Sequence, residues 1–222
     1  MKTKILFTDL DDTLLDDDKN VSAEDMASIR EMIEAGHRFV IATGRPIYSA
    51  KVVAKKLGLY SEGIYLVTSN GAAIYDCQNE KIISSVTVDP EVVREMFLAA
   101  AAEHIHIHTY TDTHVVSLRE TEELRIYCDR ISMPYKILDR IPEDLPAPPP
   151  KVVLMSIKDN SRSILEDFRK SHLWLTDGKL QSVFSNDYLL EFLPLGISKG
   201  ESLKKLCALL DIPVEEIGRA HV

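Results

Sequence analysis

The chain has 222 residues, of which 45% are hydrophobic and 27% are charged, and its formal net charge is −9. This composition predicts a globular protein with a buried core. The acidic balance, without a long basic run, excludes a typical nucleic-acid-binding protein. Three cysteines far apart in the sequence suggest neither a disulfide framework nor a zinc site. We find no signal-peptide pattern and no apolar run of membrane-spanning length, so we expect a cytoplasmic protein that binds no membrane.

The first part of the chain alternates short apolar strands with helices. We expect strands at residues 4–8, 39–42 and 65–68, and helices at 23–34 and 48–57. This order predicts a parallel sheet with right-handed crossovers, which is an α/β, doubly wound core. Ligands of such a core bind at the carboxyl ends of the strands.

The pattern changes near residue 80 to short strands and helices of α+β type with antiparallel hairpins. A proline-rich stretch at 142–150 must be extended or loop. Near residue 196 the chain again shows strong helical periodicity, like that of the helices in its first part. We therefore predict a discontinuous core domain, residues 1–82 and 190–222, with an inserted second domain at 83–189.

The clearest chemical motif follows the first strand, where Asp9 and Asp11 stand two residues apart in Asp-Leu-Asp-Asp-Thr. A carboxylate can attack phosphorus when a divalent cation relieves the charge repulsion. A second carboxylate can protonate the leaving alkoxide and then activate water. An isolated pair of this kind could equally be a solvated acidic loop, but its place after an apolar strand favours the functional interpretation.

Three further segments sit where the core would gather them. Thr43, followed by Gly44 and Arg45, offers a hydroxyl and backbone amides to phosphate oxygens. Asn70 follows the third strand, and Lys199 begins the late helix. A lysine is electrostatically disfavoured at a helix N-terminus, so Lys199 suggests a nearby carboxylate or phosphate. Taken singly, these residues could be an N-cap threonine, a turn asparagine and a surface lysine.

Together these segments resemble the haloacid dehalogenase (HAD) superfamily, specifically its Cof-like phosphatases. The resemblance covers essentially the whole chain and is carried by residues in the order that this family shows: Asp9, Asp11, Thr13, Thr43-Gly44-Arg45, Ser69-Asn70-Gly71-Ala72, Glu191, Pro194 and Lys199. It implies a Mg²⁺-dependent phosphatase that hydrolyses small phosphomonoesters, such as a sugar phosphate or a phosphorylated cofactor. The reaction would pass through an aspartyl-phosphate, and the inserted domain would be a cap.

The resemblance also implies roles for these residues. Asp9 would be the nucleophile and Asp11 the acid and base, and both would bind the metal. Thr43 and Lys199 would complete the catalytic set. The substrate-binding set would be Thr43, Gly44, Arg45, Asn70 and Lys199. Asp12 departs from the family, since many relatives have glycine at that position.

The resemblance further predicts a GDxxND-like acidic motif soon after the Lys199 helix, where this chain reads Gly218-Arg219-Ala220-His221-Val222. We therefore expect the first strand to lie at an open sheet edge and the metal to be held poorly. This leaves an alternative, a catalytically impaired HAD-fold protein with a binding or regulatory role. The sequence does not indicate an oligomeric state.

Other classes fit less well. A receiver domain would carry its phosphorylated aspartate after the third strand, where Asn70 stands here. A dinucleotide-binding enzyme would need a glycine-rich loop after the first strand. Alternation along a strand would put His104, His106 and His108 on one face, which could bind a transition metal. We favour a polar sheet face for these histidines, because no acidic or cysteine ligand accompanies them.

Overall fold

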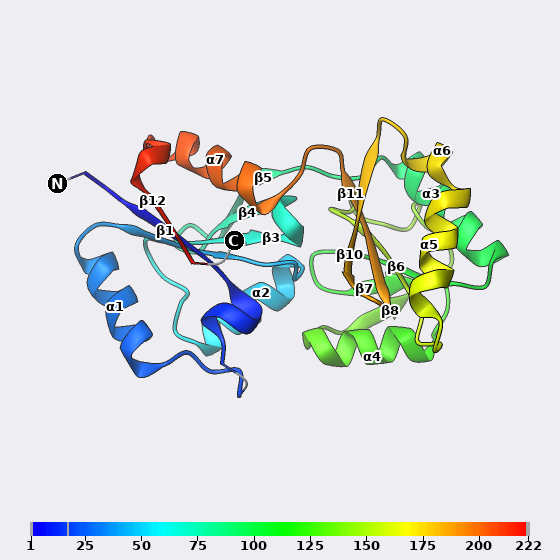
Figure 1. Ribbon diagram of the computed structural model, residues 1–222, viewed down its shortest axis with the longest axis horizontal. Helices are drawn as coiled ribbons and strands as arrows, with labels where there is room; N and C mark the ends of the chain where they lie inside the picture. Colours follow the sequence, from blue (N-terminus) through cyan, green and yellow to red (C-terminus); the bar gives the residue numbers. More distant parts are fainter. Residues whose placement is uncertain (1, 17, 221–222) are drawn as a thin grey trace. The chain divides into compact units, whose positions relative to one another are not determined.

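The computed structural model describes residues 2–16 and 18–220 (Figure 1). Its contacts divide the chain into two compact units, each described by itself below. The core unit is formed by the residues up to Ser85 and those from Ile197 onward, and the inserted unit is Val86–Gly196. Among the described residues, no helix combines the length and the apolar character needed to cross a membrane.

The core unit is built on one six-stranded sheet in the order β12-β1-β2-β3-β4-β5. The pairings among β12, β1, β2 and β3 are parallel, and β4 and β5 continue the sheet as antiparallel strands. The strands are β1 (Ile5–Asp9), β2 (Arg38–Ala42), β3 (Ile64–Thr68), β4 (Ala73–Asp76), β5 (Lys81–Ser85) and β12 (Ile217–Ala220). The helices are α1 (Ala23–Glu34), α2 (Ile47–Lys56) and α7 (Lys199–Leu209), with short turns η1 (Leu10–Leu14), η2 (Ser69–Gly71) and η3 (Val214–Glu216).

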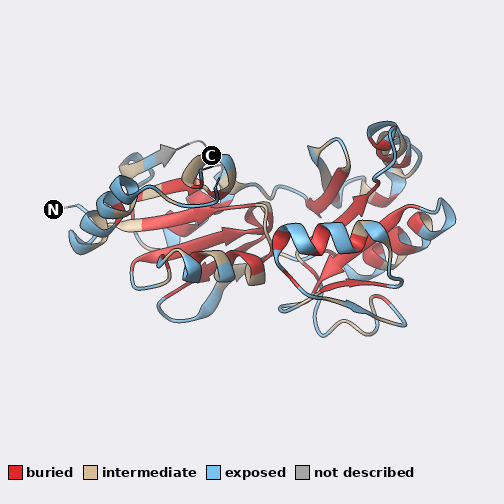
Figure 2. Cartoon of the chain, turned by 90° about the horizontal axis from the view of Figure 1, so that it is seen from below, coloured by how far each residue is buried: buried red, intermediate tan, exposed pale blue. Residues whose placement is uncertain are grey.

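Helices cover both faces of this sheet, as its sequence pattern requires. Phe39 and Ile41 of β2 pack in the cluster that includes residues of α1 and α2. Val40, the residue between them, packs with Leu203 and Leu206 of α7 on the opposite face. Strands that are buried on both faces read as continuous apolar runs, and they are largely coloured as buried in Figure 2. The prediction of a doubly wound α/β core is confirmed.

The expectation that the first strand lies at an open edge is wrong. β12 pairs with β1 in parallel, with Ile5 opposite Ile217 and Leu6 opposite Gly218. The chain reaches this position through Pro213 and the turn η3. The segment Ile-Gly-Arg-Ala is neither an apolar run nor an alternating pattern, so the sequence gives no strand signal there.

The inserted unit contains a second six-stranded sheet, in the order β10-β11-β9-β6-β7-β8. Its strands are β6 (His106–Tyr110), β7 (Val115–Ser117), β8 (Tyr135–Ile137), β9 (Val152–Met155), β10 (Leu180–Asn186) and β11 (Leu189–Pro194). Its helices are α3 (Pro90–Ala102), α4 (Glu122–Ile131), α5 (Ser161–Ser171) and α6 (Leu173–Thr176). The pairings are antiparallel except for β7 with β8, and the proline-rich stretch 142–150 is loop.

The two faces of the second sheet differ in chemistry. Ile107 of β6 belongs to an apolar cluster with residues of α3 and α5, such as Phe97 and Phe168. The other face carries buried polar groups, and α4 lies against it through the Tyr127 ring, 4.3 Å from the His108 ring. In Figure 2, α4 alternates between buried and exposed colours, because one side of the helix packs against the sheet. The inserted unit thus has an apolar core on one side of its sheet and a polar one on the other.

Candidate active site

The carboxyl ends of the parallel strands of the core unit bring the predicted site residues together. Asp9 is the last residue of β1, Thr43 directly follows β2, and Asn70 lies in the turn after β3. Lys199 is the first residue of α7. Parallel strands end at a common edge, so residues from four distant segments of the chain meet there.

Asp9 and Lys199 form a direct ion pair. The Lys199 Nζ lies 2.9 Å from Asp9 Oδ1, which also accepts a 2.9 Å hydrogen bond from the Leu10 backbone amide. Both side chains are about a quarter exposed, at 24% and 25%. The Asp9 carboxylate is therefore accessible but oriented, and the carboxylate explains why a lysine is tolerated at the start of α7.

Asp11 is held by Arg45. The Arg45 guanidinium donates from Nη2 to Asp11 Oδ1 at 2.8 Å and from Nε to Asp11 Oδ2 at 3.0 Å. Its Nη1 donates to Ser49 Oγ of α2 at 3.2 Å. A two-point pair of this kind fixes the carboxylate plane as well as its position. The sequence suggested substrate binding for Arg45 but did not reveal its pairing with Asp11, or Ser49 as a further partner.

Thr43 and Asn70 are joined through backbone and side-chain contacts. Thr43 is 1% exposed, and its Oγ1 accepts a hydrogen bond from the Arg45 amide at 3.1 Å. The Asn70 amide donates to the Thr43 carbonyl at 3.2 Å. Between them, a Cβ added to Gly44 would lie 2.8 Å from Asn70 Oδ1. Glycine at this position lets the loop after β2 approach the turn after β3.

A second close approach, between Gly71 of η2 and the start of α7, positions Lys199. Gly71 has φ +106°, and a Cβ there would lie 2.4 Å from the Ser198 carbonyl oxygen. Ser202 Oγ of α7 donates to the Gly71 carbonyl at 2.6 Å. These contacts tie η2 to the first turn of α7. The contacts of Ser198 and Ser202 could not be predicted from the sequence, because nothing local to either serine points to a partner in η2.

The oxygen donors at this site suit a hard cation. Asp9 would supply a carboxylate oxygen and Asp11 a backbone carbonyl oxygen, and oxygen is the ligand type that Mg²⁺ prefers. Within residues 2–16 and 18–220, however, no group of three or more His, Cys, Asp or Glu side chains is arranged to hold a metal. The two aspartates would therefore supply only part of the ligand set of a metal bound here.

The histidines of the inserted unit form a hydrogen-bonded row. His106 Nε2 lies 3.0 Å from His108 Nδ1, and His108 Nε2 lies 3.3 Å from the Tyr110 hydroxyl. Burial, with a smaller effect of Arg119, lowers the pKa of His106 to about 4. His104 precedes the strand at φ +56° and is exposed, so the expectation that it shares their face by strand alternation is wrong. The row has the character of a buried polar face.

The Asp9 carboxylate and its lysine partner lie at the carboxyl ends of the parallel strands, where open α/β sheets bind their ligands. Comparison of the sequence with protein-family models identifies the family. The family model of the haloacid dehalogenase-like hydrolases matches residues 6–218, and the chain belongs to this family. The superfamily resemblance drawn from the motifs is thereby confirmed, and the protein is a hydrolase of the phosphatase type.

Known proteins are similar to this chain in sequence and in fold. YxeH of Bacillus subtilis (strain 168), whose name assigns it provisionally to the phosphatases, is 23% identical over 96% of this chain and 78% of its own length. The 5-amino-6-(5-phospho-D-ribitylamino)uracil phosphatase YcsE of the same organism is 24% identical over 96% of this chain and 74% of its own. A crystal structure of a haloacid dehalogenase-like hydrolase from Bacteroides thetaiotaomicron has a TM-score of 0.88, with 24% identity, covering 98% of this chain and 81% of that one.

Proposed function

We propose that this protein hydrolyses small phosphomonoesters with Asp9 as a covalent nucleophile. The observation that carries the proposal is the Asp9 carboxylate at the end of β1, 2.9 Å from the Lys199 ammonium and beside the fixed pair of Asp11 and Arg45. An Asp9 oxygen would attack phosphorus as the ester oxygen leaves. Asp11, released from Arg45 and protonated by solvent when substrate binds, would give that proton to the leaving oxygen. Asp11 would then take a proton from the water that cleaves the acyl phosphate.

The charges around the two aspartates support this assignment. Each carboxylate has its own cation, Lys199 for Asp9 and Arg45 for Asp11. A phosphate dianion approaching the strand ends therefore meets two acidic and two basic side chains rather than two unpaired carboxylates. Thr43, with the backbone amides near Gly44 and Asn70, would bind phosphate oxygens.

Mg²⁺ is the cofactor that we propose, with Asp9 and the backbone carbonyl of Asp11 as protein ligands. It would neutralise charge on the phosphoryl group. With only these ligands from the chain, we expect weak binding in the absence of a phosphate ligand. Calorimetry with Mg²⁺ alone, and again with inorganic phosphate present, checks this expectation: submicromolar binding of Mg²⁺ alone would contradict it.

The substrate class that we propose is a sugar phosphate or a phosphorylated cofactor. The name of YcsE describes a phosphate ester of a ribityl chain attached to a uracil ring, which joins both types of group in one molecule. We further propose that the inserted unit is the cap and that it sets the choice among esters, since the groups near Asp9 address only the phosphate common to all of them.

The test is phosphate release with Mg²⁺ across a panel of monoesters, comparing the wild type with Asp9→Asn. The amide keeps the size of the carboxylate but cannot form the acyl phosphate, so the rate should fall by several orders of magnitude. Hydroxylamine should trap the intermediate in the wild type only. Retention of most activity in Asp9→Asn would overturn the covalent mechanism.

A further inference from the structure

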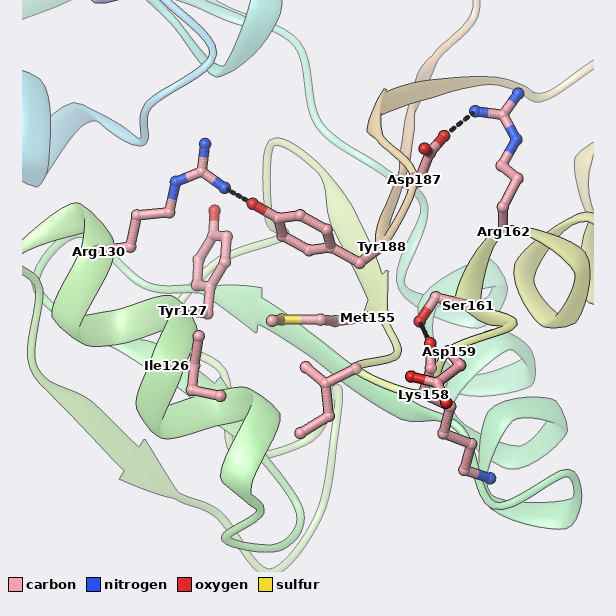
Figure 3. Close-up of a pocket in the computed structure, with 11 residues that line it drawn as sticks. Ile126, Tyr127, Arg130, Met155, Lys158, Asp159, Ser161, Arg162, Asp187 and Tyr188 are labelled. Atoms are coloured by element: carbon pink, nitrogen blue, oxygen red, sulfur yellow. Dashed lines mark hydrogen bonds and ion pairs between the residues drawn. The ribbon is translucent and has the colours of Figure 1, made fainter.

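The inserted unit contains a pocket of about 430 Å³. Its lining includes none of the residues that were assigned above to phosphate chemistry. Its walls come from α4, the end of β9, the start of α5 and the turn between β10 and β11 (Figure 3). This volume falls in the range of pockets that bind small molecules. The side chains that line the pocket determine which kind of ligand it would bind.

The interior of the pocket is apolar and partly aromatic. Met155 is buried, and the Tyr127 and Tyr188 side chains lie beside it in Figure 3. Two further lining residues, Ile126 and Ile157, are 43% and 40% exposed. A ligand that covered both isoleucines would gain the free energy of burying their side chains. Tyrosine rings and a methionine sulfur favour a flat, aromatic group over a flexible polar one.

The rim of the pocket is cationic. Arg130, Lys158 and Arg162 line it with two acids, Asp159 and Asp187, so that basic side chains outnumber acidic ones in a chain of net charge −9. Arg162 lies 3.5 Å from Asp187. In the described part of the chain, neither Arg130 nor Lys158 forms an ion pair with a carboxylate.

Arg130 is the cation best placed for a ligand that fills the pocket. Its guanidinium donates a hydrogen bond to the Tyr188 hydroxyl and lies 5.7 Å from the centre of the Tyr188 ring. A group stacked near that ring would therefore have the guanidinium beside it. Arginine recognises phosphate and carboxylate groups through paired N–H donors.

One wall of the pocket is held in place from within the unit. The Tyr127 hydroxyl lies 2.5 Å from the Tyr110 hydroxyl, which in turn lies 3.3 Å from His108 Nε2. Tyr127 is 5% exposed. A tyrosine fixed in this way loses little conformational freedom when a ligand binds, which favours affinity.

We propose that this pocket is a binding site for a flat heteroaromatic ring that carries an anionic group, of the kind found in a mononucleotide. Two sources share this chemistry, the organic part of the enzyme's own substrate and a separate effector. In the first case the site deepens the proposed phosphatase function, because it names the substrate class. In both cases the ring binds to residues of the inserted unit. The anion of an effector would bind there as well, whereas the phosphate of a substrate would bind at Asp9.

The experiment uses the full-length protein and measures binding by calorimetry and flavin fluorescence. The ligands are flavin mononucleotide with riboflavin, and uridine monophosphate with uridine. Riboflavin and uridine have no phosphate, so a phosphate-binding site cannot account for their binding. We expect at least one of the two ring systems to bind, the phosphorylated form roughly tenfold more tightly. Ribose 5-phosphate, which lacks the ring, should not displace the bound riboflavin or uridine.

Three variants locate the site. Ile126→Glu, at an exposed position of α4, should weaken binding of both the neutral and the phosphorylated ring by roughly tenfold or more, because it puts a carboxylate in the apolar part of the pocket. Leu98→Glu makes the same kind of change on α3, where the side chain is 60% exposed and does not line the pocket, and should leave binding unchanged. Arg130→Gln should weaken binding of the phosphorylated form alone, and only if the ligand is an effector, because the phosphate of a substrate would bind at Asp9. Circular dichroism confirms that each variant is folded.

Phosphate release then separates the two sources. Release from the bound mononucleotide by the wild type, but not by Asp9→Asn, identifies the ligand as substrate, whereas binding without release identifies an effector. Retained release in Asp9→Asn would reject the covalent mechanism and leave the pocket proposal standing. The pocket proposal is overturned if neither ring system binds at millimolar concentration, or if Ile126→Glu binds as well as the wild type.

Discussion

The ammonium of Lys199 lies 2.9 Å from the carboxylate of Asp9, across a separation of 190 residues in the sequence. The whole inserted unit, Val86–Gly196, lies between them in the chain. The ion pair therefore depends on the core unit closing around an insertion and on the contacts that hold the start of α7 beside the carboxyl ends of the strands. Two predictions follow from this dependence, one for the charge and one for the contact.

Lys199→Met should lower kcat by roughly two to three orders of magnitude, because a cation preorganised beside developing charge is among the largest catalytic contributions. Methionine keeps the length and apolar stem of the side chain. The measurement is steady-state phosphate release on the best substrate of the panel. Lys204→Met is the matched control, since Lys204 lies on the same helix and pairs with exposed Glu201. Equal kcat values for the two variants would remove Lys199 from the catalytic set.

Gly71→Ala should reduce both activity and stability. The added methyl would meet the Ser198 carbonyl at 2.4 Å, so the start of α7 must move and carry Lys199 with it. Gly36→Ala is the control, because Gly36 also has a positive φ, +85°, but nothing within 4 Å of the added carbon. The control should lose only the backbone strain, about 1–2 kcal/mol. A larger loss in urea denaturation and a roughly tenfold lower kcat are expected for Gly71→Ala alone.

Much of the core unit could be predicted because its signals are local. The strands β1 to β3 are short apolar runs, and each is followed directly by the polar residues that the strand end presents, such as Asp9 and Thr43. Asp12 shows that the backbone conformation at a position can persist where the residue departs from the family pattern. It departs from the glycine of many relatives, and its φ of +60° shows that the position adopts the left-handed conformation that glycine adopts without strain.

What escaped prediction depends on contacts between distant segments. β12 has no strand pattern of its own and is a strand because β1 offers it backbone partners. The fit of Gly71 against Ser198 and the pairing of Asp11 with Arg45 are likewise properties of the folded chain. The prediction that His104 shares a strand face was wrong for a local reason. The positive φ of His104, before β6, breaks the alternation that was assumed for it.

Glu191→Gln should destabilise the inserted unit by about 3–5 kcal/mol, because it leaves a buried ammonium without its countercharge. Lys151 is 1% exposed, and its Nζ lies 2.6 Å from Glu191 Oε2. Burial is the largest single influence on the pKa of Lys151 and lowers it, but the charge and hydrogen bond of Glu191 together with Tyr127 outweigh burial and raise that pKa. The measurement is urea denaturation followed by the fluorescence of Trp174, the single tryptophan, which lies in the inserted unit.

The control for this ion pair is the double variant Lys151→Met with Glu191→Leu. Replacing both charges by apolar side chains of similar size removes the desolvation penalty together with the attraction, so the double variant should be close to the wild type in stability. If Glu191→Gln unfolds at the same urea concentration as the wild type, the pair contributes nothing to the inserted unit. If the double variant is as unstable as Glu191→Gln, the loss comes from packing rather than from an uncompensated charge.

The inserted unit should lose stability as the pH falls below about 6.5, the ordinary pKa of histidine. His106 is 3% exposed, and burial lowers its pKa to about 4. Between these two pH values the unfolded chain binds a proton at this residue and the folded chain does not, so acidification favours unfolding. For His106 alone the loss approaches about 3 kcal/mol at pH 4. His108, whose pKa is lowered by burial and by His106 and Lys151, adds in the same direction.

Urea denaturation at a series of pH values, followed by Trp174 fluorescence, measures this dependence. His106→Gln should flatten the decline in unfolding free energy below pH 6.5, whatever its effect on stability at neutral pH. His104→Asn is the control, because His104 is exposed and asparagine tolerates its positive φ. It should leave the slope unchanged. A slope that is the same in His106→Gln and in the wild type would show that the buried histidine row does not govern the acid sensitivity of this unit.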